Sequence, residues 1–147
     1  MIAQEIATPP IDITTIESRW GDEDRLGHIN NVVYFRYFEE TRVRLFEQLF
    51  GDNYRQTASS PVLVHSAASY LKPLHYPSSA IIKSWLHQSG NTSLTLYHQL
   101  FDSQSSALCT VAEVKLVWIN LNSGQSSPLP PAIKAWAEQQ TRVDIPR

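Results

Sequence analysis

The sequence predicts an α+β fold in which a curved antiparallel sheet of about five strands wraps one long central helix. Three observations support this prediction. One segment has the apolar periodicity of a long helix, a strand-like stretch precedes it, and four more strand-like stretches joined by short turns follow it. Short turns imply antiparallel pairing, and a sheet wrapped against a helix buries the apolar faces of both.

The first strand is predicted over Ile11–Trp20, which is rich in isoleucine and threonine. It follows a short tail, residues 1–10, that closes with Pro9 and Pro10. The alternation of apolar and polar residues breaks near Thr15. Residue types, more than alternation, therefore predict this strand.

The long helix is predicted over Asn31–Phe50. Steps of three and four residues separate the members of its apolar face, which are Tyr34, Phe38, Thr41, Leu45 and Leu49. Asn30 or Asn31 can cap its start, and Gly51 is a typical helix stop. Such a helix would be about 30 Å long, the width of a small domain, so it must be central.

The rest of the chain is predicted to be mostly strand. The four stretches are Val62–Lys72, Ala80–Gln88, Ser93–Phe101 and Ala107–Leu121. Turn residues separate them, and a terminal segment, residues 126–147, follows the last one. Pro130 and Pro131 open a short helix in that segment.

The composition indicates one soluble domain, spanning 1–147. The formal net charge of −2 and the pI near 6.2 provide no attraction toward nucleic acid or an anionic membrane. The single cysteine, Cys109, fits a reducing compartment. No apolar run approaches the roughly 18 residues of a membrane span, and no signal peptide is apparent at the start. A cytoplasmic location without a membrane partner is therefore expected.

Motifs of several enzyme classes are missing from the sequence. It contains no G-x-S-x-G elbow of an α/β-hydrolase and no glycine-rich phosphate-binding loop. No metal-ligand spacing relates the five histidines, which are His28, His65, His75, His87 and His98. No metal or other cofactor is therefore expected, and Cys109 is expected to be a small buried residue of the core.

A dense polar run, GDEDRLGHINN, occupies Gly21–Asn31 directly before the long helix. One interpretation is structural, because acids complement the positive end of a helix and asparagines cap it, each worth up to about 1 kcal/mol. The other is catalytic, because a helix N-terminus offers unpaired N–H groups to an oxyanion that develops during a reaction.

The residues of this run resemble the opening of a known family. Arg19-Trp20-Gly21-Asp22-Glu23-Asp24, then Gly27-His28-Ile29-Asn30-Asn31 and Tyr34, are similar to the signature of the 4-hydroxybenzoyl-CoA thioesterase-like family of hotdog-fold acyl-CoA thioesterases. Later matches are Phe38-Glu39-Glu40, Arg42, Gly90-Asn91-Thr92-Ser93 and Pro128 to Pro131. The resemblance covers about Ile11 to Glu138 and implies a hotdog fold for the chain.

The resemblance also implies the site. The catalytic carboxylate of the family corresponds to Asp24, and the backbone N–H that serves as oxyanion donor falls on Asn31. His28 matches the histidine of a subgroup only, and the resemblance assigns no catalytic role to Asp22. This set suits thioester hydrolysis, since a thiol with a pKa near 8.5 leaves readily as thiolate and no strong general acid is obligatory. Asp24 would act as nucleophile or as general base.

The implied activity is hydrolysis of an acyl-CoA or acyl-carrier-protein thioester to free acid and thiol. Two alternatives stay open: a hotdog hydratase or dehydratase that uses His28 with Asp24, and a non-catalytic protein that binds acyl thioesters. The sequence does not choose the acyl group, nor between a covalent anhydride and water activated by Asp24.

Two further expectations concern partners. The turn Gln88–Thr92 lacks the basic residues with which some relatives bind the coenzyme A phosphates, so Lys72 or Lys83 would have to serve, or the carrier is an acyl-carrier protein. The sheet has edge strands that no predicted element covers, which favours a homodimer or homotetramer.

Overall fold

The computed structural model describes residues 6–52, 54 and 58–146. Its elements follow the predicted order: β1 (Asp12–Glu17), the 3₁₀ turn η1 (Trp20–Asp22), α1 (Asn31–Phe50), β2 (Ser59–Tyr70), β3 (Ser79–Ser89), β4 (Ser93–Asp102), β5 (Leu108–Asn120) and α3 (Pro131–Gln139). The predicted α+β hotdog fold is confirmed. The strand predicted over Ile11–Trp20 is shorter than expected, because the chain leaves the sheet after Glu17 and turns at η1.

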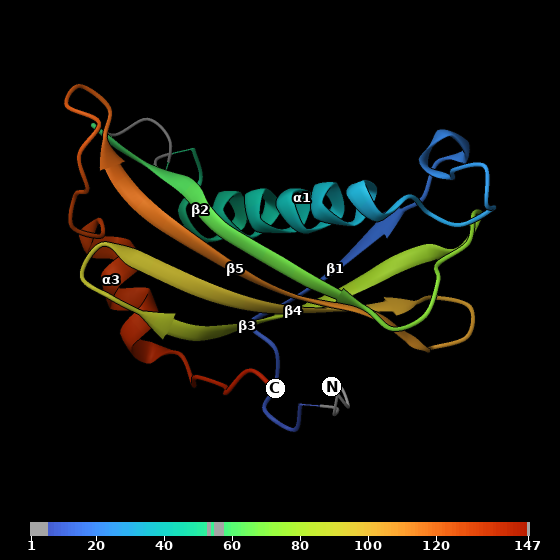
Figure 1. Cartoon of the computed structure of the whole chain (residues 1–147). Helices are drawn as coiled ribbons and strands as arrows, with labels where there is room; N and C mark the ends of the chain where they lie inside the picture. The colour runs from blue at the N-terminus through green and yellow to red at the C-terminus, as the bar shows by residue number, and fades with distance from the viewer. Residues whose placement is uncertain (1–5, 53, 55–57, 147) are drawn as a thin grey trace.

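The strands form one antiparallel sheet in the order β1-β3-β4-β5-β2, so β1 and β2 are its two edges. The sheet curves beneath α1, which lies across its concave face (Figure 1). Helix α1 begins at Asn31 and ends at Phe50, as predicted, with Gly51 as its C-cap at a positive φ of 59°. The N-cap is Asn30, the first of the two asparagines considered.

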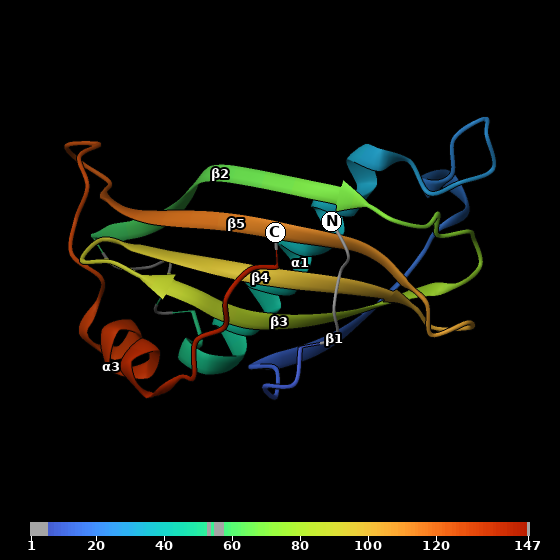
Figure 2. The ribbon, with the colours of Figure 1, turned by 60° about the horizontal axis from the view of Figure 1, so that its bottom comes forward.

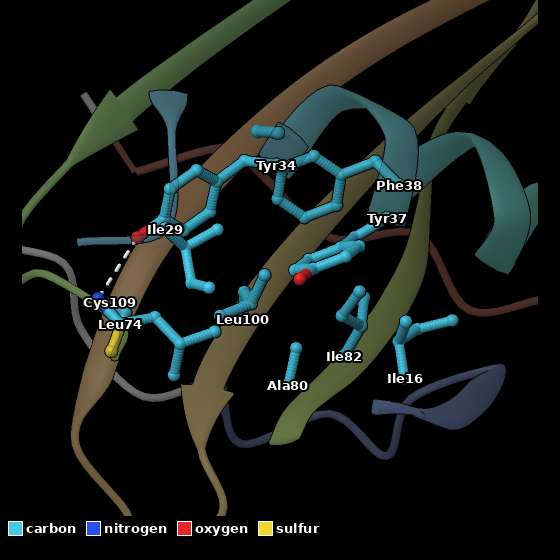
Figure 3. Close-up of a cluster of buried hydrophobic side chains, with 11 residues drawn as sticks. Ile16, Ile29, Tyr34, Tyr37, Phe38, Leu74, Ala80, Ile82, Leu100 and Cys109 are labelled. Carbon is cyan, nitrogen blue, oxygen red and sulfur yellow. Dashed lines mark hydrogen bonds between the residues drawn. The ribbon is translucent and has the colours of Figure 1, made fainter. Parts of the chain in front are cut away.

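The core lies between α1 and the sheet. Figure 3 shows its first part, where Tyr34 and Phe38 of α1 meet Ile82 and Leu100 of the strands. The predicted helix face was wrong at Leu49, which is 41% exposed. The last turns of α1 bury Phe46 instead, because it packs edge-on against Trp118 at a centroid distance of 6.0 Å.

The convex face of the sheet is covered as well. The segment after α3 crosses this face (Figure 2), where the N–H of Val143 donates to the carbonyl of Leu86 at 3.0 Å. From the other end of the chain, the carbonyl of Thr8 accepts a hydrogen bond from Trp85 Nε1 at 2.7 Å. Strand β4 is therefore buried on both faces from Leu94 to Leu100. Within the described residues, no helix is long and apolar enough to cross a membrane.

Candidate active site

The polar run that precedes α1 is anchored by Asp22, which is only 2% exposed. Its carboxylate accepts hydrogen bonds from the backbone N–H of Arg19 at 2.9 Å, from the guanidinium of the same arginine at 3.0 and 3.2 Å, and from the hydroxyl of Tyr37 at 2.7 Å. Its carbonyl accepts from the N–H of Asn30 at 2.9 Å. Asp22 thus ties the loop to the helix and is not available to a substrate.

The ionisation of Asp22 fits this role. Burial opposes its charge, but the hydrogen bonds from Tyr37 and Arg19 outweigh burial and lower the pKa of Asp22. Burial and the bond to Asp22 in turn raise the pKa of Tyr37, so the phenol stays protonated and donates. The carboxylate is therefore a permanent acceptor that fixes the loop in place.

Asp24 lies in a tight turn two residues further on. Its N–H donates to the carbonyl of His28 at 2.9 Å, and its Oδ1 accepts from the N–H of Leu26 at 2.8 Å. Gly27 closes the turn at a φ of +76°, a conformation that L side chains rarely adopt. Among the described residues, no group hydrogen-bonds to Oδ2 of Asp24, so this oxygen is free to act on a substrate.

The backbone N–H groups at the start of α1 differ in their partners. Asn30 Oδ1 accepts from the N–H of Val32 at 3.0 Å, and the Asn30 carbonyl accepts from Val33 at 2.9 Å. Within the described part of the chain, the N–H of Asn31 has no acceptor. A free N–H in the first turn of a helix also carries the partial positive charge of the helix dipole. It can therefore stabilise an oxyanion.

These groups meet at one pocket of about 300 Å³ beside the N-terminus of α1. Its lining comprises Asp24, His28, Ile29, Asn31, Tyr34, Tyr70, Leu71, Lys72 and Pro73. All three predicted site residues, Asp24, His28 and Asn31, line it. Carboxylate, imidazole and helix N-terminus therefore face the same small space.

Two tyrosines also line this pocket: Tyr34, which belongs to the signature run and to the predicted apolar helix face, and Tyr70, which the sequence analysis did not single out. The hydroxyl of Tyr70, at the end of β2, donates to the carbonyl of Asn31 at 2.8 Å, and its ring lies edge-on to that of Tyr34 at 5.3 Å. The hydroxyl of Tyr34 accepts from the N–H of Leu74 at 3.0 Å, drawn as a dashed line in Figure 3. The two tyrosines connect the end of β2 to the first turn of α1. The spacing of residues within a strand does not predict such contacts between a strand end and a helix.

The segment after β2 also holds the loop. The N–H of Ile29 donates to the carbonyl of Leu74 at 2.8 Å, and the N–H of Tyr76 donates to Glu23 Oε1 at 3.1 Å. Between these two bonds, His75 Nδ1 donates to the carbonyl of Gly27 at 2.9 Å. Three consecutive residues, Leu74 to Tyr76, thus bind the turn that carries Asp24.

The two lysines considered for carrier binding lie in different places. Lys72 lines the pocket. Lys83 lies over the ring of Phe101, 4.9 Å from its centroid, and its register partner is Gln99. That side of the sheet faces away from α1, since the next residue, Ser84, bonds His98 beneath the helix. Only Lys72 can therefore reach a molecule bound at the pocket.

The remaining reactive groups do not extend the site. Cys109 is buried, as predicted, and burial raises the pKa of its thiol. A larger hollow of about 910 Å³ lies between β1 and α1, but its arginines are paired with acids, for example Arg44 with Glu40 at 2.5 Å. In the described ranges, no three His, Cys, Asp or Glu side chains form a metal-binding group.

Comparisons with known proteins identify the family and the fold of the chain. Residues 18–137 match the family model of the thioesterase-like superfamily. PA2801 of Pseudomonas aeruginosa, a candidate thioesterase of solved structure, is 35% identical, with a TM-score of 0.80 over 86% of this chain and 98% of that chain. Uncharacterized protein YsmA of Bacillus subtilis is 30% identical over 113 residues, 76% of this chain and 74% of YsmA. The candidate acyl-CoA thioesterase YneP of the same bacterium is 31% identical over 87 residues, 56% of this chain and 62% of YneP.

Proposed function

The chain belongs to the thioesterase-like superfamily, and from this membership we propose that it hydrolyses an acyl-CoA thioester to a free acid and a thiol. The observation that supports the proposal is the pocket beside α1, which Asp24 and Asn31 both line. A carboxylate and an oxyanion donor at one carbonyl are the parts that this reaction needs.

In the proposed reaction, the thioester carbonyl lies between Asp24 and the start of α1. Either Asp24 takes a proton from a water that attacks the carbonyl carbon, or its carboxylate attacks directly and forms a mixed anhydride that water then cleaves. In both routes the carbonyl oxygen becomes an oxyanion that accepts the Asn31 N–H bond. The C–S bond then breaks, and the sulfur leaves as thiolate.

His28 has a supporting place in this proposal. It lines the pocket, and its backbone carbonyl closes the turn at Asp24. An imidazole ring nitrogen can donate or accept a hydrogen bond at the pocket. Only a subgroup of the family that the sequence resembles has this histidine.

The proposal also covers the group that carries the acyl chain and the oligomeric state of the protein. Lys72 at the pocket supports binding of the coenzyme A phosphates, whereas a thioester of an acyl-carrier protein would need less basic charge there. The free edges of β1 and β2 support a homodimer or homotetramer. A cytoplasmic location, expected from the single cysteine, stays a prediction.

The experiment that tests the proposal is thiol release from a panel of acyl-CoA substrates, followed with a disulfide dye. Rapid release from at least one member supports hydrolysis, and the acid is identified by mass. A hydratase would change the acyl mass by one water without releasing thiol. A binding protein would do neither, and both of these outcomes contradict the proposal.

A further inference from the structure

The residues that line the pocket beside α1 differ strongly in exposure. Tyr70, Leu71 and Lys72, at and after the end of β2, are exposed. Ile29 and Tyr34, which line the same pocket, are each only 3% exposed. The first three residues therefore lie at the mouth of the pocket, and the last two form its base.

This difference sets the direction in which a thioester binds. The phosphates of coenzyme A are charged and stay in water at the mouth, beside Lys72, whereas an apolar acyl group gains free energy when it is buried. Asn31 and Tyr34 are three positions apart on α1 and so lie on the same face of the helix. A thioester whose carbonyl oxygen binds at Asn31 therefore directs its acyl group toward Tyr34.

The ring of Tyr34 is held at both ends. Its backbone belongs to α1, and its hydroxyl accepts the N–H of Leu74 at 3.0 Å (Figure 3). The ring of Tyr70 packs edge-on against it at 5.3 Å and is itself fixed by the hydrogen bond to the carbonyl of Asn31 at 2.8 Å. If Tyr34 swung aside for a longer chain, the N–H of Leu74 would lose its acceptor inside the protein, which is costly.

Core side chains lie behind Tyr34. It belongs to the same cluster as Phe38, Leu100, Cys109 and Ala112, each of which is at most 2% exposed. Protein interiors are packed as densely as organic crystals, so an acyl chain cannot enter this cluster without displacing a side chain. Because these neighbours are apolar or small, a shortened side chain at position 34 would open a space that suits further methylene groups.

The volume of the pocket limits the acyl group to a few carbons. About 300 Å³ is at the lower end of the range of ligand pockets, roughly 300–1,000 Å³. At about 30 Å³ for a group the size of water, this space holds roughly ten non-hydrogen atoms. The thioester and the adjoining atoms of the carrier occupy part of it, which leaves room for about six acyl carbons.

We infer that the ring of Tyr34 ends the acyl site, so that the substrate carries a short aliphatic acyl group of up to about six carbons. This inference rests on the proposed hydrolysis and deepens it, because it names the class of acyl group and the residue that limits its length. While the chain fits, each further methylene group should raise kcat/KM about fourfold, which is the effect of one buried CH₂. Beyond that length the gain ends.

Thiol release from straight-chain acyl-CoA substrates, from acetyl to decanoyl, tests the length limit. Wild-type kcat/KM should be highest at about four to six carbons and fall about tenfold or more by decanoyl. Tyr34→Ala should move the maximum to longer chains, whereas Tyr34→Phe keeps the ring and should keep the wild-type maximum. The matched control is Phe50→Ala, which removes a ring at the other end of α1, where Phe50 packs edge-on against Trp136 at 6.1 Å. Its maximum should not move.

These variants are compared by ratios of kcat/KM between substrates, so a general loss of stability or activity does not imitate a shift in length. A wild-type maximum at decanoyl, a folded Tyr34→Ala with the wild-type profile, or an equal shift in Phe50→Ala would overturn the inference. The proposed hydrolysis would survive each of these results, because all of them require thiol release.

Binding of S-alkyl-CoA thioethers tests the limit without hydrolysis and without a variant, since these molecules have no carbonyl to attack. Their dissociation constants for the wild-type protein, measured by calorimetry, should stop decreasing beyond about six carbons. Constants that keep decreasing through the decyl compound would overturn the inference. If thioethers show the limit but no acyl-CoA releases thiol, the proposed hydrolysis fails and the limit on chain length stands.

Discussion

The imidazole of His75 lies edge-on to that of His28, with ring centroids 5.1 Å apart. The same ring donates its Nδ1–H to the carbonyl of Gly27 at 2.9 Å. His75 is exposed and does not line the pocket, whereas His28 does. His75 therefore affects the pocket indirectly, by holding the turn that also carries Asp24.

The first prediction separates the two contacts of His75. His75→Phe keeps an aromatic edge against His28 but loses the donor to Gly27, whereas His75→Asn keeps an amide N–H near the position of Nδ1. We expect the phenylalanine variant to lower kcat about tenfold, equivalent to about 1.4 kcal/mol, with little change in KM or Tm. The asparagine variant should recover most of kcat. Equal kcat values for both variants would show that the hydrogen bond does not position the turn.

The second prediction concerns the anchor at Asp22. Asp22→Ala leaves the buried hydroxyl of Tyr37 and the N–H of Arg19 without their acceptor, so the free energy of unfolding should fall by roughly 2–3 kcal/mol. Urea denaturation measures this loss. Activity and stability should fall together, in contrast to a substitution that removes only chemistry. Wild-type stability in this variant would refute the anchoring role.

The third prediction is a pH dependence of stability that arises from His98. This histidine is fully buried, stacked on Phe38, and its pKa is lowered to about 3 by burial and by the charge of Arg42. The unfolded chain binds a proton at His98 below about pH 6.5, and the folded chain does not. The free energy of unfolding should therefore decrease as the pH is lowered from about 6.5 to 3, by up to about 1.4 kcal/mol for each pH unit.

His98→Gln removes this titration and should flatten the slope of unfolding free energy between about pH 6 and 4. The ionisation of Asp22 does not contribute to the slope between about pH 6 and 4. Its pKa is lowered in the folded state, so its contribution is lost only below the unfolded value near 3.9. An unchanged slope in His98→Gln would mean that other groups cause the acid sensitivity.

The fourth prediction uses the two lysines. Lys72→Gln should raise KM for an acyl-CoA several-fold, because this residue lines the pocket, and leave kcat similar. Lys83→Gln is the matched control, since Lys83 lies over Phe101 on the other side of the sheet. Salt should raise KM of the wild type and have less effect on Lys72→Gln. Equal KM values for the two variants would exclude Lys72 from carrier binding.

The sequence predicted well what depends on neighbouring residues. The bounds of α1 follow from its periodicity, Asn30 and Gly51, all of which act within one or two turns. Asp24, His28 and Asn31 lie within eight positions of one another, so a tight turn at Gly27 is enough to bring them to one pocket. Their neighbourhood could therefore be expected from the motif alone.

What the sequence did not predict depends on register and on distant segments. The face on which Lys83 lies is fixed by its pairing with Gln99, and a shift of one residue would reverse it. The bonds from Leu74 and His75 to the loop join residues more than 40 positions apart. Arg42 of α1 is buried in the folded chain, although charged residues of a helix usually face solvent.

Asp24→Asn tests most directly whether the carboxylate of Asp24 performs the chemistry. Asparagine keeps an Oδ1 acceptor for the N–H of Leu26, so the turn should persist, but an amide neither attacks a thioester nor takes a proton from water. Glu23→Gln is the matched control, because it removes the adjacent charge and keeps an acceptor for the N–H of Tyr76.

The deciding measurement is kcat for thiol release by these two variants, on the best substrate of the panel and with Tm recorded for each. Asp24→Asn is expected to lose on the order of 10³-fold or more in kcat, about 4 kcal/mol of transition-state stabilisation, while Tm stays at the wild-type value. Glu23→Gln should retain most of the activity. If Asp24→Asn keeps more than about a tenth of wild-type kcat, equivalent to a loss below about 1.4 kcal/mol, this carboxylate is not the catalytic group and the polar run before α1 is structural.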